Sequence, residues 1–507
     1  MPEPTFHGLT SSPHDRALVA NVHPADWKNP EPADRYHLVV VGGGTAGLVS
    51  AAGAAGMGAR VALVERGLLG GDCLNVGCVP SKGLLRAARS WSEARSSAVR
   101  FGGPRADGAG DFPLAVERMR RLRAGISHND SAARFRDLGV DVFLGEGRFI
   151  ASDALDVDGR RLRFRRAVIA TGARAAAPPI PGLDQVDYLT NETLFGLTEL
   201  PRRLAVIGAG PIGCEMAQAF ARFGSEVHLI EAMDRILPLE EEDAAGVVRR
   251  ALEADGVQIL CCGKDTRISR GEDGAKRITL ESEGSAYDLA VDAILVSVGR
   301  KPNVEGLGLE AAGVVFDAKG VTVDDRLRTS NSRILAVGDI ASRYKFTHSA
   351  DALARIAIQN ALFFGRKRAS DLVVPWCTYT DPEIAHVGLY PREAEERSID
   401  IDTFQVDLSS VDRAILDGEA EGFLRVHAKK GSGRILGATA VAAHAGDLID
   451  EVTLAMTHKI GLGSVAGSIH AYPTQAEVFK KVGDAYQRTK LTPTVEKIFA
   501  LFFRIFR

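Results

Sequence analysis

Residues 36–47 read YHLVVVGGGTAG, a β-branched apolar run that ends in a glycine-rich turn. The alanine-rich residues 48–58 follow and predict a helix, and residues 60–65 (RVALVE) predict a second strand. A helix between two short apolar strands is typical of a βαβ unit with parallel strands. We therefore expect this stretch to begin a parallel α/β sheet.

Three glycines and one acidic residue indicate what this unit binds. Gly42 permits the tight turn, Gly44 lets the backbone approach a pyrophosphate, and Gly47 lets helix and sheet pack closely. The helix N-terminus offers N–H groups and a partial positive charge to phosphates. Glu65 ends the second strand, where a carboxylate accepts hydrogen bonds from ribose hydroxyls. The stretch thus predicts a dinucleotide site.

The same unit occurs a second time, at residues 203–231. Its glycines are Gly208, Gly210 and Gly213, and its acidic residue is Glu231. The acidic residue follows the first glycine by 23 positions in both copies. One glycine motif is weak evidence, because such turns recur by chance. Two copies in full strand–helix–strand context predict two Rossmann-like domains and two dinucleotides.

Residues 70–82 read GGDCLNVGCVPSK and hold two cysteines, Cys73 and Cys78. Residues five apart on a regular α-helix point to different faces, so a disulfide between them requires a distorted turn, which Gly77 permits. A cysteine pair near a βαβ unit is typical of a redox-active dithiol. We interpret the pair as a disulfide that opens and closes.

Two other interpretations of this pair are buried small hydrophobic residues and half of a zinc site. Zinc requires two further ligands. Cys261 and Cys262 are adjacent, and Cys214 and Cys377 are isolated, so no second spaced pair exists. The redox interpretation is favoured, and no metal site is predicted.

The composition limits the class of protein. The chain has 507 residues, 45% hydrophobic and 25% charged, so roughly two to four globular domains are expected. A formal charge of −3 gives no reason to expect nucleic acid. Six cysteines favour a reducing compartment, and residues 1–27 lack the apolar segment of a signal peptide. No run reaches the roughly 18 apolar residues of a spanning helix, so a soluble cytoplasmic protein is expected.

Three further apolar strands are each predicted to end at a glycine. They are residues 166–172, which end in Thr171 and Gly172, residues 293–299, which end in Gly299, and residues 334–338, which end in Gly338 before Asp339. A core strand followed by a turn explains each one alone. Asp339 is also placed to accept a hydrogen bond from a ribityl or ribose hydroxyl.

The pattern changes from Trp376 onwards. Residues 423–427 alternate in polarity, residues 430–434 predict a tight turn, and residues 435–440 predict a returning strand. Helices are predicted at 447–460 and 474–486. This region indicates a third domain built on an antiparallel sheet, and it carries no nucleotide motif.

Together these motifs resemble the pyridine nucleotide-disulfide oxidoreductases. The resemblance rests on residues 70–82, on the two glycine motifs, and on the sequences ATG at 170–172, GRKPN at 299–303 and TDPE at 380–383. It covers roughly residues 36–490. Within the family, the chain is most similar to mercuric reductase-like and dihydrolipoamide dehydrogenase-like flavoproteins.

The resemblance implies the domain organisation and the cofactors, FAD and a nicotinamide dinucleotide. It implies a homodimer whose active sites each use both chains. The implied boundaries are an N-terminal extension at 1–35, an FAD domain at 36–185 and 300–374, an NAD(P) domain at 186–299, an α+β dimerisation domain at 375–490 and a C-terminal amphipathic helix at 491–507.

The resemblance also assigns roles to single residues. Cys78 would be the thiol against the flavin, Cys73 the outer thiol that meets the acceptor, and Lys82 the lysine near the flavin that pairs with Glu215. Electrons would pass from the nicotinamide to the flavin, to the disulfide, and outward from Cys73. The residues expected to contact the cofactors are Gly42, Gly44, Gly47, Glu65, Gly71, Lys82, Thr171, Gly172, Gly208, Gly210, Gly213, Glu231, Gly299, Gly338 and Asp339.

At residues 472–477 the chain departs from the family pattern. Disulfide-reducing members have His-Pro-Thr-x-x-Glu and use the histidine as the acid–base catalyst of the partner's site. This chain has Tyr472 in its place and keeps Glu477. A phenol with a pKa near 10 does not shuttle protons near neutrality as an imidazole near 6.5 does. His470 is either a substitute base or a surface histidine, and all three residues are catalytic candidates.

Mercuric reductases also lack this histidine, which suits a soft metal acceptor that needs thiolates. They carry a C-terminal cysteine pair, however, and this chain ends LFFRIFR. The expected acceptor is therefore a small disulfide, a soft metal ion or a quinone-like oxidant. The alternatives are a reductase that serves a protein partner and a dihydrolipoamide dehydrogenase.

Glu231 also bears on the nicotinamide cofactor. A carboxylate at this strand end accepts a bond from a free ribose 2′-OH and repels a 2′-phosphate. NADH is therefore expected to be preferred to NADPH. Arg235 weakens this expectation without reversing it.

The C-terminal residues 493–507 carry an apolar helical stripe. Two interpretations are open: docking against the protein's own body or its dimer partner, which is favoured, and peripheral membrane contact through an interfacial helix. The stripe consists of Val495, Ile498, Phe499, Phe502, Phe503 and Phe506, with Lys497, Arg504 and Arg507 outside it.

Overall fold

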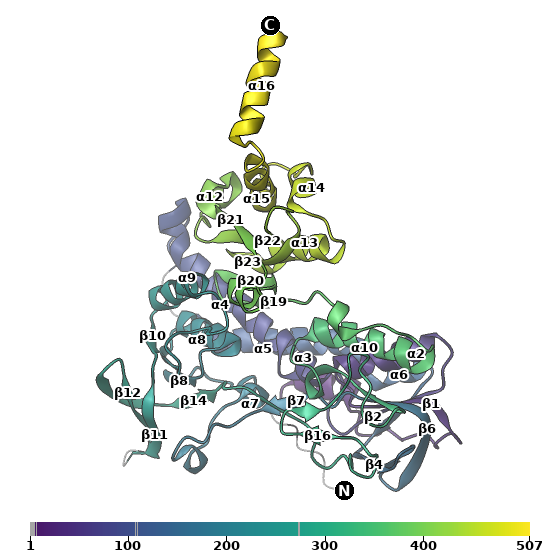
Figure 1. Ribbon diagram of the computed structural model, residues 1–507. Helices are drawn as coiled ribbons and strands as arrows, with labels where there is room; N and C mark the ends of the chain where they lie inside the picture. Colours follow the sequence, from purple (N-terminus) through teal and green to yellow (C-terminus); the bar gives the residue numbers. More distant parts are fainter. Residues whose placement is uncertain (1–5, 7, 107, 109, 272–273, 507) are drawn as a thin grey trace.

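The structure is a computed structural model, and it describes residues 6, 8–106, 108, 110–271 and 274–506. Two mainly parallel sheets lie side by side in the lower part of the molecule, and an antiparallel sheet lies above them (Figure 1). The predicted α/β class with a C-terminal α+β part is therefore confirmed.

The first sheet contains the first glycine unit. It has seven strands in the order β3-β2-β1-β6-β5-β4, and β18 also pairs with β6. The strands β3, β2, β1, β6 and β18 are parallel, and β5 and β4 are antiparallel additions. Their bounds are β1 (Tyr36–Val41), β2 (Val61–Glu65), β3 (Val140–Leu144), β4 (Gly147–Ala151), β5 (Ala154–Val157), β6 (Arg160–Ile169) and β18 (Ile334–Ala336), with the short helix α6 (Ala132–Asp137) before β3.

Two helices pack together on this sheet, α2 (Thr45–Gly56) and α10 (Thr347–Leu362). Every residue of β1 from Leu38 to Val41 is buried, because the parallel strands are covered on both faces. The carboxyl ends of β1 and β6 lie at the same edge, where residues 42–44 and 170–172 follow. That edge is where the first glycine turn opens.

The second sheet contains the second glycine unit. It is a four-stranded parallel sheet, β10-β9-β8-β14, and smaller antiparallel ladders are formed by the segments between and around its strands in the chain. The bounds are β8 (Arg203–Ile207), β9 (Glu226–Ile230), β10 (Val257–Leu260), β14 (Ala293–Val296), β11 (Lys264–Arg270), β12 (Lys276–Ser282), β13 (Ser285–Val291), β7 (Ala173–Ala175), β15 (Arg300–Pro302), β16 (Phe316–Asp317) and β17 (Gly320–Val321), with helices α7 (Asn191–Leu194), α8 (Pro211–Phe223) and α9 (Glu242–Ala254).

The C-terminal part is built on the predicted antiparallel sheet, in the order β19-β20-β23-β22-β21. Helix α13 ends earlier than expected, because Lys459 has a φ of 58°, which a right-handed helix does not allow. The bounds are β19 (Pro375–Thr378), β20 (Glu383–Gly388), β21 (Ile401–Asp407), β22 (Phe423–Lys429) and β23 (Ile435–Ala442), with α11 (Pro391–Glu396), α12 (Asp412–Leu416), α13 (Ala445–Thr457), α14 (Leu462–Ala466) and α15 (Glu477–Arg488).

The long helix α4 (Cys78–Phe101) connects the parts. It packs against α5 (Phe112–Ile126) and against α8, beneath the antiparallel sheet (Figure 1). Its Arg89 donates to the carbonyl of Ala443 at 3.2 Å and to Glu419 at 3.1 Å. The helix that begins at Cys78 is thus fixed by all three sheet regions.

The N-terminal extension folds back onto the first domain. Helix α1 (Pro13–Val22) begins after Ser12, whose side chain caps it, and packs against α5. Leu18 and Val22 are fully buried. From α1 onwards, the extension is therefore not a free tail but a segment that covers the first domain.

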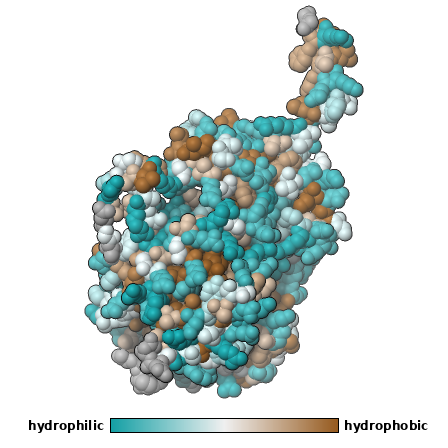
Figure 2. All heavy atoms as spheres, turned by 90° about the vertical axis from the view of Figure 1, so that its left-hand side faces the viewer, coloured by the Kyte–Doolittle hydropathy of each residue, from teal (hydrophilic) through white to brown (hydrophobic). Residues whose placement is uncertain are grey.

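Helix α16 (Pro493–Ile505) stands clear of the rest of its chain (Figures 1 and 2). None of its residues is buried. The neighbouring part of the core is already filled by Val478, Phe479 and Val482 of α15. The expectation that the stripe docks on the body of its own chain is therefore not met. No helix in the described part of the chain is both long and apolar enough to cross a membrane.

Candidate active site

In each glycine turn, the first and third glycines are required by the fold. Gly42 and Gly208 have φ values of 106° and 100°, which favour glycine. A Cβ on Gly47 would lie 1.8 Å from the carbonyl oxygen of Gly42, and one on Gly213 would lie 1.9 Å from that of Gly208. These glycines make the turn and the close helix contact, as expected from the motif.

The second glycine of each motif is not required by the fold. Gly44 and Gly210 have ordinary φ values of −77° and −74°. Among the described residues, a Cβ on Gly210 would meet nothing within 4 Å, and one on Gly44 would approach only the Cα of Gly71, at 3.7 Å. Because neither packing nor backbone geometry requires glycine here, the open space at both helix N-termini fits a pyrophosphate. The residues present thus fit two dinucleotides.

The acidic residues close their own turns. Glu65 accepts hydrogen bonds from the N–H groups of Gly43 and Gly67, the latter at 2.6 Å. Glu231 accepts them from the N–H groups at the equivalent positions, Ala209 at 2.7 Å and Met233 at 2.9 Å. Burial raises the pKa of Glu65, while these N–H groups oppose the rise. Each carboxylate therefore orders its glycine turn, and only its remaining lone pairs are left for a further hydrogen bond.

The two cysteines lie in two consecutive helices, the first short and the second long. Cys73 is in α3 (Gly71–Asn75), and Cys78 is the first residue of α4. Gly77 precedes the helix with φ −133° and ψ −118°, so the distorted turn lies where the sequence suggested. Both thiols are free in this structure. The Sγ of Cys78 also lies 3.5 Å from Oγ1 of Thr347, the first residue of α10.

The pKa values of the two thiols are displaced in opposite directions. The pKa of Cys78 is lowered to about 6, first by a hydrogen bond from Cys73 and then by Thr347 and the charge of Lys82, against burial. The pKa of Cys73 is raised by that same bond and by burial. Near pH 7 the pair therefore holds one thiolate, on Cys78, and one neutral thiol.

Lys82 lies one turn along α4 from Cys78. Its Nζ donates to Oε2 of Glu215 at 2.9 Å, and Glu215 is almost fully buried in α8. The other carboxylate oxygen accepts the N–H of Tyr379 at 2.9 Å, and the Lys82 ammonium lies 4.4 Å from the centre of the Tyr379 ring. Tyr379 was not among the predicted site residues, although it directly precedes the TDPE sequence.

Asp339 is bound by Arg300, which lies in the GRKPN motif but was not among the predicted site residues. Arg300 donates through Nε to Asp339 at 3.1 Å, and its Nη2 bonds to Asp72 and to the carbonyl of Ala173. Burial raises the pKa of Asp339, and Arg300 opposes the rise. Arg300 therefore links the cysteine segment to the turn after β18.

The other predicted cofactor residues lie along the same edge. Thr171 donates through Oγ1 to the carbonyl of Asn303 at 3.0 Å. Gly172 and Gly299 face open space, because no atom of the described residues lies within 4 Å of the point that a Cβ would occupy. The structure thus brings the strand ends after β6, β14 and β18 to one region.

The residues near the altered histidine motif lie in the C-terminal part. His470 contacts Glu451 through Nε2 at 3.0 Å, and its side chain is only 8% exposed. Tyr472 is 70% exposed and donates to Asp412 at 2.8 Å. Glu477 begins α15. Within the described chain, no hydrogen bond or ion pair joins these residues to the cysteine pair.

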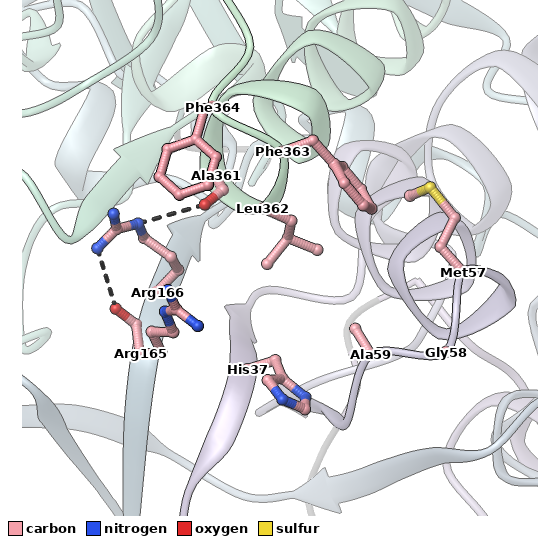
Figure 3. Close-up of a pocket in the computed structure, with 10 residues that line it drawn as sticks. All are labelled: His37, Met57, Gly58, Ala59, Arg165, Arg166, Ala361, Leu362, Phe363 and Phe364. Atoms are coloured by element: carbon pink, nitrogen blue, oxygen red, sulfur yellow. Dashed lines mark hydrogen bonds between the residues drawn. The ribbon is translucent and has the colours of Figure 1, made fainter.

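A separate pocket of about 190 Å³ lies at the far ends of α2 and α10 (Figure 3). Its lining includes His37, Arg166 and Phe364 and none of the predicted site residues. Because it is at the opposite ends of these helices from Gly44 and Thr347, it is not part of the redox site. The described residues contain no group of three or more His, Cys, Asp or Glu that could hold a metal ion.

Comparisons with known proteins agree with this geometry. Residues 36–354 match the family description "Pyridine nucleotide-disulphide oxidoreductase", and residues 374–482 match its dimerisation domain. The chain belongs to this family of FAD- and pyridine-nucleotide-dependent oxidoreductases, and the dimerisation-domain match supports a homodimer.

Several relatives cover nearly the whole chain. A mercuric reductase of Bacillus cereus is 35% identical over 88% of this chain and 70% of its own length. A dihydrolipoyl dehydrogenase of Chlamydia muridarum is 34% identical over 88% of this chain and 96% of its own length. Among solved structures, the HOCl-induced flavoprotein disulfide reductase RclA of Escherichia coli has a TM-score of 0.78 at 29% identity, covering 89% of this chain and 99% of its own. The names of these relatives point to different substrates, so the family is shown and the electron acceptor of this chain is not.

Two glycine variants separate fold from binding. Gly210→Ala should leave the melting temperature unchanged, because its Cβ meets nothing, and should raise the KM for the nicotinamide cofactor about tenfold or more, about 1.4 kcal/mol. Gly213→Ala should lower the melting temperature, because its Cβ would overlap Gly208. Thermal unfolding and steady-state kinetics measure both. Unchanged kinetics in Gly210→Ala would contradict the assigned pyrophosphate position.

Proposed function

We propose that this protein is an NADH-dependent flavoprotein reductase whose dithiol, Cys73 and Cys78, reduces a soft metal ion. The observation that carries the proposal is that Cys78, whose pKa is lowered, lies beside the Cys73 thiol, while Tyr472 stands where disulfide reductases have their acid–base histidine. Thiolates are the ligands that soft metal ions prefer. A metal acceptor needs no proton shuttle of the kind that a leaving thiol needs.

In this proposal the first glycine turn holds FAD and the second holds NADH. When bound, FAD would supply the means of accepting a hydride equivalent from the nicotinamide and of passing two electrons to the disulfide. The Lys82–Glu215 pair supplies a positive charge beside the thiolate of Cys78. Arg300, held between Asp339 and Asp72, orders the cofactor-facing edge. The charges of these residues are fixed before any ligand arrives, which avoids reorganisation during the reaction.

The number of electrons transferred is consistent with a divalent metal ion as the acceptor. NADH supplies two electrons and one proton, which convert the Cys73–Cys78 disulfide to the Cys73 thiol and the Cys78 thiolate. A divalent ion such as Hg²⁺ then takes up the two electrons and becomes Hg⁰, while the disulfide re-forms and the proton is released. Relatives named mercuric reductase, and a solved Cu(II) complex of RclA, support a metal acceptor. In this proposal the metal reaches Cys73 directly.

A second candidate acceptor is a small disulfide. Relatives named dihydrolipoyl dehydrogenase, at 34% identity, favour it. The contacts of His470 speak against it, because this imidazole is turned to Glu451 and is hardly exposed. A quinone-like oxidant and a protein partner are the remaining alternatives.

An acceptor screen tests the proposal. With NADH, the purified protein should reduce Hg²⁺ in the presence of excess thiol at least about tenfold faster than it reduces lipoamide or glutathione disulfide, a difference of about 1.4 kcal/mol in activation free energy. Cys73→Ser should abolish metal reduction and retain dye reduction by the flavin. The Cys377→Ser variant is the matched control and should behave like the wild type. Faster turnover of a disulfide would overturn the proposed acceptor.

We further propose NADH as the electron donor. Glu231 lies beside the second turn, where its charge repels a 2′-phosphate. Arg235 lies close to Glu242, at 3.9 Å, and to the carbonyl of Pro238, so other groups of this chain already compete for it. Both observations favour a cofactor with a free 2′-OH.

The donor proposal predicts at least about tenfold higher kcat/KM with NADH than with NADPH. Arg235→Ala should leave the ratio of kcat/KM for NADH to that for NADPH within about twofold of the wild-type value, whereas Glu231→Ala should lower this ratio. Initial rates at varied cofactor concentration measure these ratios. Equal use of NADPH by the wild type would refute the assignment.

We also propose that α16 contacts the cytoplasmic surface of a membrane. Seven large apolar residues of this helix and its C-terminal cap are between 48% and 71% exposed. By helical spacing, Lys497 and Arg504 lie opposite the stripe that contains Phe499, Phe502 and Phe506. At 1.5 Å per residue the helix is about 20 Å long, enough to lie in an interface and too short to span. A second copy would cover only a narrow stripe of so broad a face. Anionic lipid complements the basic flank.

A liposome assay tests this contact. The full chain should sediment with liposomes that contain phosphatidylserine, and a chain that ends at Leu491 should not, while keeping its flavin and its melting temperature. Lys497→Glu with Arg504→Glu should weaken binding but keep the apolar face, which isolates the charge contribution. If neither chain binds and truncation changes the oligomeric state, the helix pairs copies of the protein.

A further inference from the structure

Helix α1 lies against the segment that leads to the cysteines. Leu18 and Val22 share one buried core with Leu69 and Leu74. The N–H of Leu69 donates to the carbonyl of Val22 at 3.2 Å, and Nδ1 of His23 lies 2.7 Å from the carbonyl of Gly67. The N-terminal extension thus supports the cysteine segment directly.

A buried ion pair stands at the centre of this contact. Asp15 of α1 and Arg123 of α5 are 1% and 0% exposed, and Oδ1 of Asp15 accepts from Nη2 of Arg123 at 2.6 Å. The other oxygen of Asp15 accepts the N–H and hydroxyl of Thr10, both at 2.8 Å, and lies 3.7 Å from Arg120. A buried guanidinium requires such a partner, because an unpaired buried charge is strongly destabilising.

The second nitrogen of Arg123 reaches the cysteine segment. Its Nη1 donates to the main-chain carbonyl of Asn75 at 2.6 Å. Asn75 ends α3, and its side-chain amide donates to the carbonyls of Leu69 and Gly71, at 3.0 and 2.8 Å. Arg123 and Asn75 together therefore close the loop that carries Cys73.

We propose that Asp15 is a positioning residue for the redox pair: through Arg123 and Asn75 it fixes α3, and so holds the Cys73 thiol against Cys78. The inference rests on the redox role proposed for the cysteines and not on the identity of the acceptor. Replacing a buried ion pair by apolar groups is often neutral for stability. What an apolar pair would not supply is the fixed donor to the carbonyl of Asn75.

This arrangement has a measurable consequence for Cys78. Its thiolate is stabilised first by the bond from Cys73, so any loosening of α3 should raise the pKa of Cys78 from about 6 towards its ordinary value. The other groups that act on the two thiols are Thr347 of α10, Lys82 of α4, Glu215 of α8 and Asp130. In the described structure no hydrogen bond or ion pair joins any of these groups to Asp15 or Arg123, so their interactions with the thiols should be unchanged.

The test measures alkylation of Cys78 against pH in the reduced holoenzyme, with mass spectrometry to resolve each cysteine. Wild-type labelling should be half-maximal near pH 6. In the double variant Asp15→Asn with Arg123→Met, which removes both charges, the midpoint should rise by about one unit or more. Cys73→Ala removes the bond itself and gives the upper limit of the shift.

Two further variants keep the test decisive. Ser12→Ala removes the cap of α1 and its bond to Glu117, so it should lower the melting temperature and leave the midpoint unchanged. Asp15→Glu keeps a buried carboxylate, so this variant should fold even if the double variant Asp15→Asn with Arg123→Met does not. Its longer side chain should raise the labelling midpoint of Cys78 by a smaller amount. A wild-type midpoint in a folded Asp15 variant would overturn the proposal, whichever acceptor the enzyme uses.

Discussion

The N-terminal N–H groups of three helices are the feature on which the rest of the structure depends. Helices α2, α4 and α8 each begin after a glycine, and none of the three has a side-chain cap. Other helices of this chain do have such caps, for example Asp111 before α5 and Thr492 before α16. Because the N–H groups and the positive end of the dipole stay free, these three termini can receive a phosphate or a thiolate.

The sheets serve to bring these helix ends together. Parallel strands place every following turn at the same edge, so both glycine turns open at carboxyl ends of strands. Helix α4 crosses between the two parallel sheets and carries Cys78 at its first position. One rigid helix therefore fixes Cys78 with respect to both dinucleotide regions. The pKa of Cys78 is lowered first by the hydrogen bond from Cys73 and then by Thr347 and the charge of Lys82.

Three pairs of buried or half-buried charges gather around this region. Lys82 with Glu215, Arg300 with Asp339, and Arg123 with Asp15 each join segments that are far apart in sequence. Desolvation makes such pairs weak contributors to stability. Their common property is geometric, since each fixes a main-chain segment or a charge next to the cysteines or the glycine turns.

Much of the fold was determined by the sequence alone. Local patterns suffice for a βαβ unit, because the apolar strand runs, the glycine spacing and the acidic strand end all lie within one short stretch. The two glycine units, the antiparallel C-terminal sheet and the separate C-terminal helix were predicted on that basis. The adjacency of Cys73 and Cys78 was also predictable, because only a local turn at Gly77 was needed.

Other features were decided by the tertiary structure. The partners of Asp339 and Glu215, namely Arg300 and the N–H of Tyr379, come from segments remote in the chain, and the orientation of His470 towards Glu451 depends on packing between α13 and the loop before α15. The placement of α1 under the cysteine segment and the exposed position of α16 were likewise open from sequence, since an amphipathic stripe shows that a face must be covered but not what covers it. Sequence determined the elements, because they arise from local spacing; only the tertiary structure decided which charges meet, because burial and distance are properties of the packed chain.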